Sequence, residues 1–594
     1  MRKKKAGHLV LGLLLFLGCV GSNTTAAQTL ELKNVTRQGF EGLKPLDKNG
    51  YYLQFIEGAK GSGKTAKQLL HLYILDNPLK IASDFVLELS PNETVDDVAF
   101  NGGNFMVIYS NPLARTRTMK VVDKQGKEIA TKKIEKLPYR TAGRSSAIEP
   151  VGAADFLVIN YVKDKKFGYS VERFDEKLES KYSQLQIPEK KKIYPVDYTL
   201  SGNRLYVLEY VDADASDYFE YHLAAFDLAT GSLLKSQDLK SADGKAFGFA
   251  TFVKPAPNGG AVTGGMYFDS PKVQKANSDG FFAAQMKPDG TLDFSYTNWD
   301  QVKNVVKDKS TAAMWGGKTK TFMHDLVVKP DGSYTLIGEN YRRGDSDLAG
   351  EQSKNGLAIA SKALKVTDLS GGGEPSEEAV TVAEFVLIDY DAQNKFTGVR
   401  KIDKPNAVTV VKLTQEQGNL SYIGQRKGLN LANILNNYGY FPYRFTAQGT
   451  SRPYLTYWQR YDPLKKELLY FTPLDAQQTD TVSVDVSSAD LQQFQALESS
   501  ITGKLGALGK LAKKVEEVKG DDHKNYFELK GSHDPYDYRA KDLNSRVMAS
   551  NVAGKILIYD FVPEPGSEKK SFFAQLTDTT PGTLKVWYID IPGK

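Results

Sequence analysis

The sequence contains a single cysteine, Cys19, among its 594 residues. A chain with one thiol cannot form an internal disulfide, so no disulfide framework stabilises the fold. Histidine is also scarce: there are six, and no two of them stand at a spacing typical of a zinc site. We therefore predict no metal site and no cofactor.

Long apolar runs are also rare. One run, Leu9–Leu17, follows the basic start RKKK and is too short to span a bilayer, which indicates a signal peptide. Cleavage after the small residues TAA would remove residues 1–27. Alternatively, FLGC resembles a lipoprotein box, whose processing would remove residues 1–18 and lipidate Cys19. Either route predicts an exported protein in the periplasm, outer membrane or cell surface, with membrane contact only through a lipid anchor.

The charge is low for a chain of this size. The formal net charge of +6 includes the four basic residues of the signal peptide, which has no acidic residue, so the mature chain carries 6 − 4 = +2. No basic block suited to nucleic acid is present, and we predict no nucleic-acid partner. With 41% apolar residues, the chain can bury a large core in one closed domain or several small ones.

A repeat of about fifty residues runs through the chain. Each unit opens with an apolar strand such as NFMVIYS or DFLVINY, crosses a polar loop, and returns through a second strand that ends near an aspartate. In the four clearest units these aspartates are spaced by 47, 52 and 52 residues, and they are Asp76, Asp123, Asp175 and Asp227. Weaker copies of the unit follow toward the C-terminus. The period points to a repeat architecture.

Turn signals complete each unit. A short strand such as DDVAFNGG precedes it, and turns such as DKQG and DLATG follow its last aspartate. Aspartate can cap its own turn through its side chain, and glycine accepts the positive φ of a tight hairpin. Each unit therefore reads as four antiparallel strands. Seven or eight such units predict an all-β fold, a β-propeller of four-stranded blades. The alternative is a string of β-sandwiches.

One segment departs from the repeat. Residues 487–520 place apolar side chains, including Leu491, Phe494 and Ile501, at helical spacing. We predict the propeller blades over residues 28–480, a helical insertion over residues 487–520, and the last blade with the ring closure over residues 521–594.

The segment GAKGSGKT, residues 58–65, matches the phosphate-loop pattern G-x-x-x-x-G-K-[ST]. In the repeat it occupies the loop between two antiparallel strands. A phosphate loop needs a helix after it, because the helix N-terminus supplies donors to the phosphates. The following residues, AKQLLHLYILD, align with strand-like stretches of the other units. We therefore predict a hairpin loop and no ATP binding.

The most suggestive surface segment is NNYGYFPYRFTAQGTSRPYLTYWQRYD, residues 436–462. Tyrosine, tryptophan and arginine anchor many interfaces and stack on sugars. The segment covers the long loop and second strand of the seventh unit, so part of it should be exposed at a ring face. The predicted binding residues are Tyr438, Tyr440, Tyr443, Arg444 and Trp458. For the strand portion, ordinary sheet packing is the alternative.

The start of the predicted mature chain, AQTLELKNV, and the Tyr- and Lys-rich strands resemble uncharacterised exported proteins of Bacteroidetes-type bacteria. The resemblance implies an envelope location and no activity. We predict a binding or scaffold module for a protein or glycan partner. The alternative is a propeller enzyme, a glycan hydrolase or lyase with acids at the central channel. No catalytic residue can be named, because distant acids meet only in the fold.

Overall fold

A computed structural model describes most of the chain. The described residues are 29–36, 39–46, 50–60, 67–90, 92–111, 113–135, 137, 146–163, 167–188, 191–212, 220–271, 278–305, 319–343, 376–404, 407–413, 441–459, 468–475, 481–486, 547–563 and 581–591. The predicted signal peptide, Cys19 and the predicted helical insertion at 487–520 lie outside them. No helix among the described residues is long and apolar enough to cross a bilayer.

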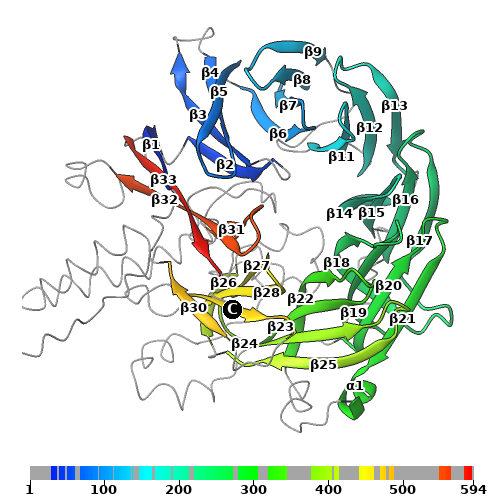
Figure 1. Ribbon diagram of the computed structural model, residues 1–594. Helices are drawn as coiled ribbons and strands as arrows, with labels where there is room; N and C mark the ends of the chain where they lie inside the picture. The colour runs from blue at the N-terminus through cyan, green and yellow to red at the C-terminus, as the bar shows by residue number, and fades with distance from the viewer. Residues whose placement is uncertain are drawn as a thin grey trace, which may run out of the picture.

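The described residues form eight antiparallel sheets arranged in a ring around a central axis (Figure 1). Within each of the first seven sheets, four consecutive strands run from the axis to the circumference. This confirms the predicted β-propeller and sets the number of blades at eight.

The first four blades have regular, consecutive strands. Blade 1 comprises β2 (Phe40–Pro45), β3 (Tyr51–Lys60), β4 (Lys67–Leu75) and β5 (Ile81–Leu89). Blade 2 comprises β6 (Thr94–Phe100), β7 (Asn104–Asn111), β8 (Thr116–Asp123) and β9 (Glu128–Ile134). Blade 3 comprises β10 (Ser146–Val151), β11 (Asp155–Lys163), β12 (Phe167–Asp175) and β13 (Ser180–Gln186). Blade 4 comprises β14 (Lys192–Ser201), β15 (Arg204–Asp212), β16 (Glu220–Asp227) and β17 (Leu233–Asp238).

The other four blades carry the additions to the ring. Blade 5 comprises β18 (Phe247–Pro255), β19 (Ala261–Phe268), β20 (Gly280–Met286) and β21 (Leu292–Asn298), followed by the helix α1 (Trp299–Val305). Blade 6 comprises β22 (Thr319–Val328), β23 (Tyr334–Arg343), β24 (Ser376–Tyr390), β25 (Phe396–Ile402) and β26 (Ala407–Leu413). Blade 7 comprises β27 (Tyr443–Gln448), β28 (Pro453–Gln459), β29 (Leu468–Pro473) and β30 (Val482–Asp485). Blade 8 comprises β31 (Val547–Ala549), β32 (Lys555–Pro563), β33 (Pro581–Asp590) and β1 (Thr29–Thr36).

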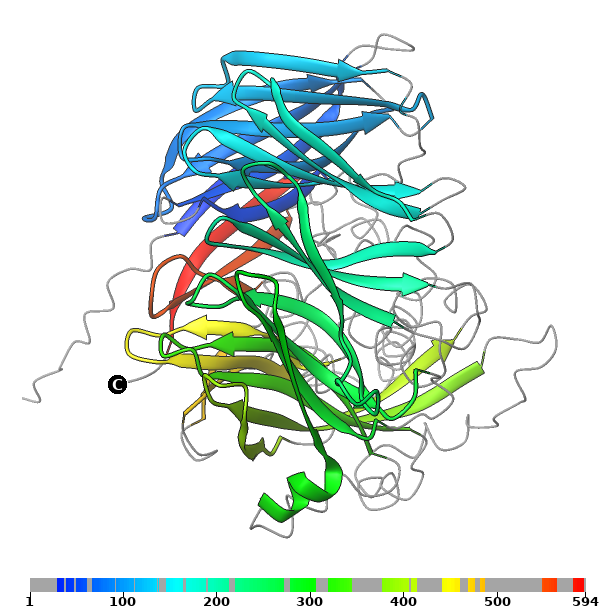
Figure 2. The same cartoon turned by 90° about the vertical axis from the view of Figure 1, so that its right-hand side faces the viewer.

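Two additions stand out from the ring. The helix α1 lies at the outer circumference, where it packs against β20, β21 and β25. The start of β24 extends beyond the blade and pairs with β26, and the two strands project from one face in yellow-green and yellow (Figure 2).

The strand sequences follow from the ring geometry. A middle strand packs against a neighbouring blade on both faces, so every residue of β19 and β20 is buried. Such strands show continuous apolar runs instead of alternation. The core lies between blades, as where Leu157 and Val171 of blade 3 meet Leu205 and Val207 of blade 4.

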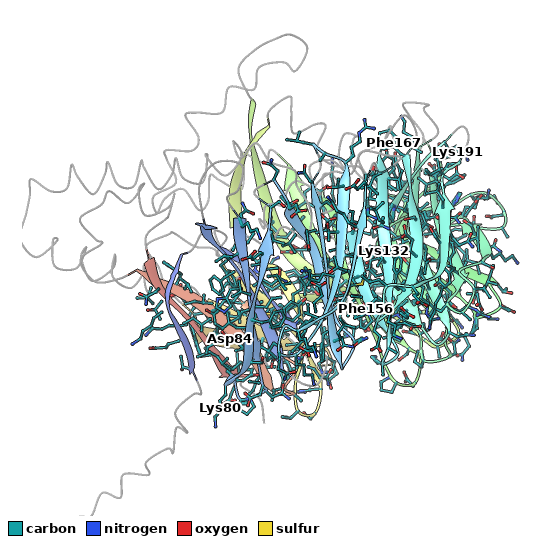
Figure 3. All side chains as sticks on the ribbon, turned by 90° about the horizontal axis from the view of Figure 1, so that it is seen from above. Lys80, Asp84, Lys132, Phe156, Phe167 and Lys191 are labelled. Carbon is teal, nitrogen blue, oxygen red and sulfur yellow. The ribbon has the colours of Figure 1, made fainter. Side chains whose placement is uncertain are left out.

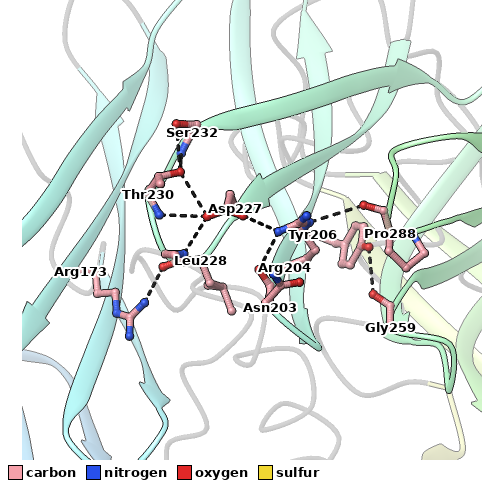
Figure 4. A network of polar contacts seen from close by, with 11 residues as sticks. Arg173, Asn203, Arg204, Tyr206, Asp227, Leu228, Thr230, Ser232, Gly259 and Pro288 are labelled. Carbon is pink, nitrogen blue, oxygen red and sulfur yellow. Dashed lines mark hydrogen bonds and ion pairs between the residues drawn. The ribbon is translucent and has the colours of Figure 1, made fainter.

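The turn after the third strand behaves as its sequence predicts. The Asp123 carboxylate accepts hydrogen bonds from the backbone N–H groups of Gln125 and Lys127, both at 2.9 Å. Asp227 caps its turn in the same way, through the N–H groups of Ala229 and Thr230 (Figure 4). Self-capping by these aspartates is therefore confirmed.

The phosphate-loop match lies in a hairpin. Strands β3 and β4 are antiparallel, with residue pairs from Tyr51↔Leu75 to Lys60↔Lys67, while residues 61–66 lie outside the described residues. The stretch that would have to form a helix is the strand β4, as predicted. Among the described residues, Lys67–Leu75 is therefore a strand and does not supply the helix N-terminus that a phosphate loop needs.

The N-terminal strand closes the ring. β1 is the outermost strand of blade 8, where it pairs with β33 from Thr29↔Trp587 to Thr36↔Pro581. The interface between blade 8 and blade 1 contains polar as well as apolar contacts. The Tyr588 hydroxyl donates to the Asn77 carbonyl at 2.7 Å, and the hydroxyls of Tyr51 and Ser550 lie 2.9 Å apart.

Candidate functional site

The central channel can hold a site built from several blades, because the innermost strand of every blade faces it (Figure 1). Six of these eight strands shift register against their neighbour, namely β2, β6, β14, β18, β22 and β27. Bulges re-aim side chains and are common next to active sites. In this ring they fall at polar residues such as Asp96, His324 and Arg444.

Asp97 on β6 ties three blades together. Its carboxylate accepts the N–H of Val98 in its own blade at 2.8 Å and the N–H of Ile148 in blade 3 at 2.9 Å. It also forms an ion pair with Lys44 of blade 1. Although burial opposes the charged ammonium, the Asp97 carboxylate and Tyr52 raise the pKa of Lys44 above its ordinary value. Asp97 therefore links blade 2 to blades 1 and 3.

Aspartates on other innermost strands make similar contacts to neighbouring blades. Asp197 on β14 accepts the N–H of Val253 in blade 5 at 2.8 Å. Asp325 on β22 accepts the N–H of Leu326 at 2.9 Å and contacts the Lys254 ammonium of blade 5 at 2.8 Å. The carboxylates of blades 2, 4 and 6 thus hold their neighbours in place.

Asp197 makes the stability of the ring depend on pH. Burial raises the pKa of Asp197 to about 6, against the opposing effects of the Val253 N–H and the Lys254 ammonium. An unfolded aspartate titrates near ~3.9, so the folded protein binds more protons between about pH 4 and pH 6, and this contribution to stability is lost as the pH rises. We expect Asp197→Asn to remove that part of the slope in thermal unfolding measured across the window. An unchanged slope in the variant would contradict this assignment.

The structure places the predicted binding residues in part. Tyr443 and Arg444 lie on β27, the innermost strand of blade 7, and not in the predicted long loop. Residues 453–459 form β28, the opening strand of the unit, and not the returning strand that was predicted; the returning strand is β29. Trp458 belongs to β28, although its side chain is outside what the structure describes. Tyr438 and Tyr440 lie outside the described residues.

Tyr443 and Arg444 make contacts within the ring. The Tyr443 ring stacks on the His324 imidazole at a centroid distance of 4.9 Å, and its hydroxyl donates to Asp325 at 2.8 Å. Burial and the Asp325 carboxylate raise the pKa of Tyr443 above its ordinary value. The Arg444 guanidinium donates to the carbonyls of Phe441 and Tyr443, at 3.2 and 2.8 Å. The Tyr443 contacts join blades 6 and 7, whereas those of Arg444 stay within its own segment, and the binding role stays a prediction.

A buried polar cluster lies beside Tyr443. The imidazole Nε2 of His324 is 2.9 Å from the Glu339 carboxylate, and the Lys404 ammonium contacts the other oxygen of Glu339. The three side chains are at most 1% exposed. Burial lowers the pKa of Lys404 well below its ordinary value. Because no substrate reaches groups this deep without opening the blades, we interpret the cluster as structural.

The described channel wall therefore holds acids that are already engaged. Asp97, Asp197 and Asp325 all accept hydrogen bonds from backbone N–H groups, and Glu149 accepts one from the Tyr198 hydroxyl at 2.9 Å. A glycosidase needs two carboxylates that face the substrate across a bond. Among the described residues, these four carboxylates instead form hydrogen bonds within and between the blades.

The outer circumference differs between the two halves of the ring. The exposed large apolar side chains of the described residues all belong to blades 1–4, and six of the seven lie on the outermost strands β5, β9, β13 and β17. They are Ile81, Val86, Leu113, Ile129, Leu185, Leu233 and Leu234. Beside blades 5 and 6 the helix α1 packs on the outer strands and buries Val302. The sequence did not indicate that these outer strands expose aliphatic side chains. The alternation of apolar and polar residues along a strand does not show whether another element packs on its outer face.

One group of described residues has the composition of a metal site. Glu220, His222 and Asp238 bring three potential ligand atoms within 4.8 Å of one another on blade 4. The sequence predicts no metal site, since the ligands are contributed by two strands. The one local signal is E-x-H on a strand, which places both side chains on the same face.

A comparison with known protein families identifies a family. The family described as "Family of unknown function (DUF6770)" matches residues 7–458, more than half of the chain. No curated protein matches.

Solved structures resemble the chain at low identity. Polysaccharide lyase Uly1 is 10% identical, with 93% of this chain and 90% of that chain covered and a TM-score of 0.34. The β-propeller domain of the Trilobed protease from Pyrococcus furiosus is 10% identical, with 65% and 97% covered and a TM-score of 0.29. Pyrococcus horikoshii acylaminoacyl peptidase is 10% identical, with 73% and 57% covered and a TM-score of 0.28. These likenesses have no bearing on function.

Proposed function

The chain belongs to the DUF6770 family of unknown function, and we propose that it is an exported β-propeller that serves as a binding or scaffold module for a protein partner in the cell envelope. The basic start and the apolar run Leu9–Leu17 support export. N-terminal sequencing of the mature protein tests this, since it distinguishes a start at Gln28 from a blocked, lipidated Cys19.

One observation carries the choice of a protein partner. The exposed large apolar side chains of the described residues are all aliphatic, and most lie on the outermost strands of four consecutive blades. Glycan recognition favours exposed aromatic rings on which sugars stack, whereas aliphatic side chains beside an unpaired strand edge suit a protein segment. The strands β5, β9, β13 and β17 each end their sheet, so each presents such an edge.

The engaged channel acids are consistent with this proposal. Asp97, Asp197 and Asp325 link several neighbouring blades, which stiffens that part of the ring. A rigid frame lowers the entropic cost of binding at its surface.

The experiment places a photo-crosslinking amino acid at Leu185 on β13, or at Val86 on β5, in the native host. We expect a discrete crosslinked product with one envelope protein from both positions. With the crosslinker at Val86, Leu185→Lys should reduce that product at least ~10-fold, because a charge replaces a contact worth about 1.4 kcal/mol or more. The midpoint of thermal unfolding should stay unchanged, since Leu185 is 56% exposed.

The matched control is Ser483, an exposed residue on β30, the outermost strand of blade 7. The same crosslinker at Ser483 should give no such product, and Ser483→Lys should leave capture at Leu185 intact. Equal crosslinking from Ser483 and Leu185 would show that the product is non-specific. Loss of capture in both lysine variants would overturn the assignment to blades 1–4.

A further inference from the structure

The group Glu220, His222 and Asp238 lies at the end of blade 4, on the ring face that Lys191 marks in Figure 3. Lys80, in the turn between β4 and β5, marks the opposite face. Glu220 and His222 are two residues apart on β16, so their side chains lie on one side of the sheet. Asp238 on β17 pairs directly with His222. Strand geometry thus brings three ligand types to one point.

The distances are close to those around a single ion, although Glu220 lies nearer to His222 than two ligands of one ion would. The His222 Nε2 lies 2.6 Å from Glu220 Oε1 and 3.2 Å from Asp238 Oδ1. A four-coordinate ion with ligand bonds of ~2.0–2.2 Å holds its ligand atoms somewhat more than 3 Å apart. A small rotation of the Glu220 side chain would therefore open the triangle enough for an ion.

A buried carboxylate lies behind the imidazole. Glu209 on β15 pairs directly with His222, and its Oε2 lies 3.8 Å from the His222 Nδ1, while the Ser236 hydroxyl lies 3.5 Å from both of these atoms. Glu209 is 4% exposed and accepts a hydrogen bond from the Tyr169 hydroxyl of blade 3. Histidines that bind metal usually turn their other ring nitrogen toward such a carboxylate, which fixes the tautomer. Glu209 and Ser236 thus face the Nδ1 side of the ring, while Nε2 faces Glu220 and Asp238.

Two lysines pair with the acids of the group. The Lys191 ammonium donates to both oxygens of Glu220, at 2.9 Å to Oε2 and at 3.2 Å to Oε1, and Lys240 pairs with Asp238 Oδ2. Glu220 Oε1 and Asp238 Oδ1 face the imidazole. The lysines offset part of the negative charge, and an ion bound at Glu220 Oε1 would replace the longer Lys191 contact.

We propose that Glu220, His222 and Asp238 bind one divalent transition-metal ion, such as Zn²⁺, with Glu209 as the positioning residue behind His222. An imidazole in the ligand set favours Zn²⁺ or Co²⁺ over Ca²⁺ or Mg²⁺, which prefer oxygen ligands alone. The ligands are 17–38% exposed, so a further coordination position faces solvent. A partner or small ligand could fill that position.

The test titrates Zn²⁺ alone, and separately Co²⁺ alone, into the chelator-treated full-length mature protein. We expect saturable binding of one ion, a rise in the thermal midpoint, and visible Co²⁺ ligand-field absorption, with no competition from Mg²⁺. His222→Ala and Asp238→Asn should abolish the Co²⁺ spectrum. Glu209→Gln should retain it with affinity reduced roughly 10–100-fold.

The matched control is His71→Ala. His71 on β4 pairs with the exposed Asp84 carboxylate at 3.1 Å, and its loss should leave binding unchanged. Circular dichroism of each variant establishes whether it is folded. If His222→Ala does not fold, the Asp238→Asn variant provides the test of the metal ligands. Binding that persists in both ligand variants, or no saturable binding by the parent protein, would overturn the proposal and leave an ion pair only.

Discussion

Replacing Glu339 by glutamine is expected to lower the free energy of unfolding by about 3–5 kcal/mol. The Glu339 carboxylate is fully buried and contacts both His324 and Lys404. Glutamine cannot accept from both groups with equal strength, so at least one buried polar group loses its partner. Urea unfolding of the variant and the parent protein measures the loss.

A double replacement measures how strongly the effects of Glu339 and Lys404 on stability are coupled. Glu339→Leu combined with Lys404→Met removes both partners and should cost less than the sum of the two single changes, because buried ion pairs are often replaceable by apolar side chains of similar volume, while the loss of the His324 contact remains. The control is Glu135→Gln, since Glu135 forms an exposed pair with Lys133. That change should fall within ~0.5 kcal/mol. Additive losses in the double variant would contradict the coupling.

Removing β1, residues 29–36, is expected to open the ring and cost several kcal/mol. Leu30, Leu32 and Val35 are at most 9% exposed and pack with the core of blade 8 and blade 1. Burial of one such side chain is worth about 1.5–3 kcal/mol. The deletion also leaves one edge of β33 unpaired. Calorimetry and limited proteolysis of blade 8 measure the effect.

Point variants on β1 give the sharper comparison. Leu32→Ala should cost about 2–5 kcal/mol, because it leaves a cavity between the last and the first blade. Its neighbour Glu31 points outward, where it pairs with Lys585 at 3.0 Å, and Glu31→Ala should cost less than about 1 kcal/mol. Equal losses at the two positions would mean that β1 does not seal the ring.

The local features of the blades were predictable. Apolar strands such as β7, turns such as the one capped by Asp123, and the β3–β4 hairpin depend on residues only a few positions apart. The spacing of the repeat then implied a ring. The prediction was less accurate for blade 7, where Tyr443–Gln448 forms the innermost strand and not a loop. An aromatic stretch fits an inner strand as well as a surface loop, because sequence does not show which blade packs beside it.

The sequence by itself determined the strand period, the capped turns and thereby the class of fold, since these follow from local hydrogen bonding and alternation. Only the tertiary structure decided which distant residues meet. Asp97 and Ile148 are 51 residues apart, and Asp325 and Tyr443 are 118 apart. The same is true of β1 with β33, and of the partners that bury Glu339. Ring closure sets these contacts, and a periodic sequence carries little information about which blade faces which.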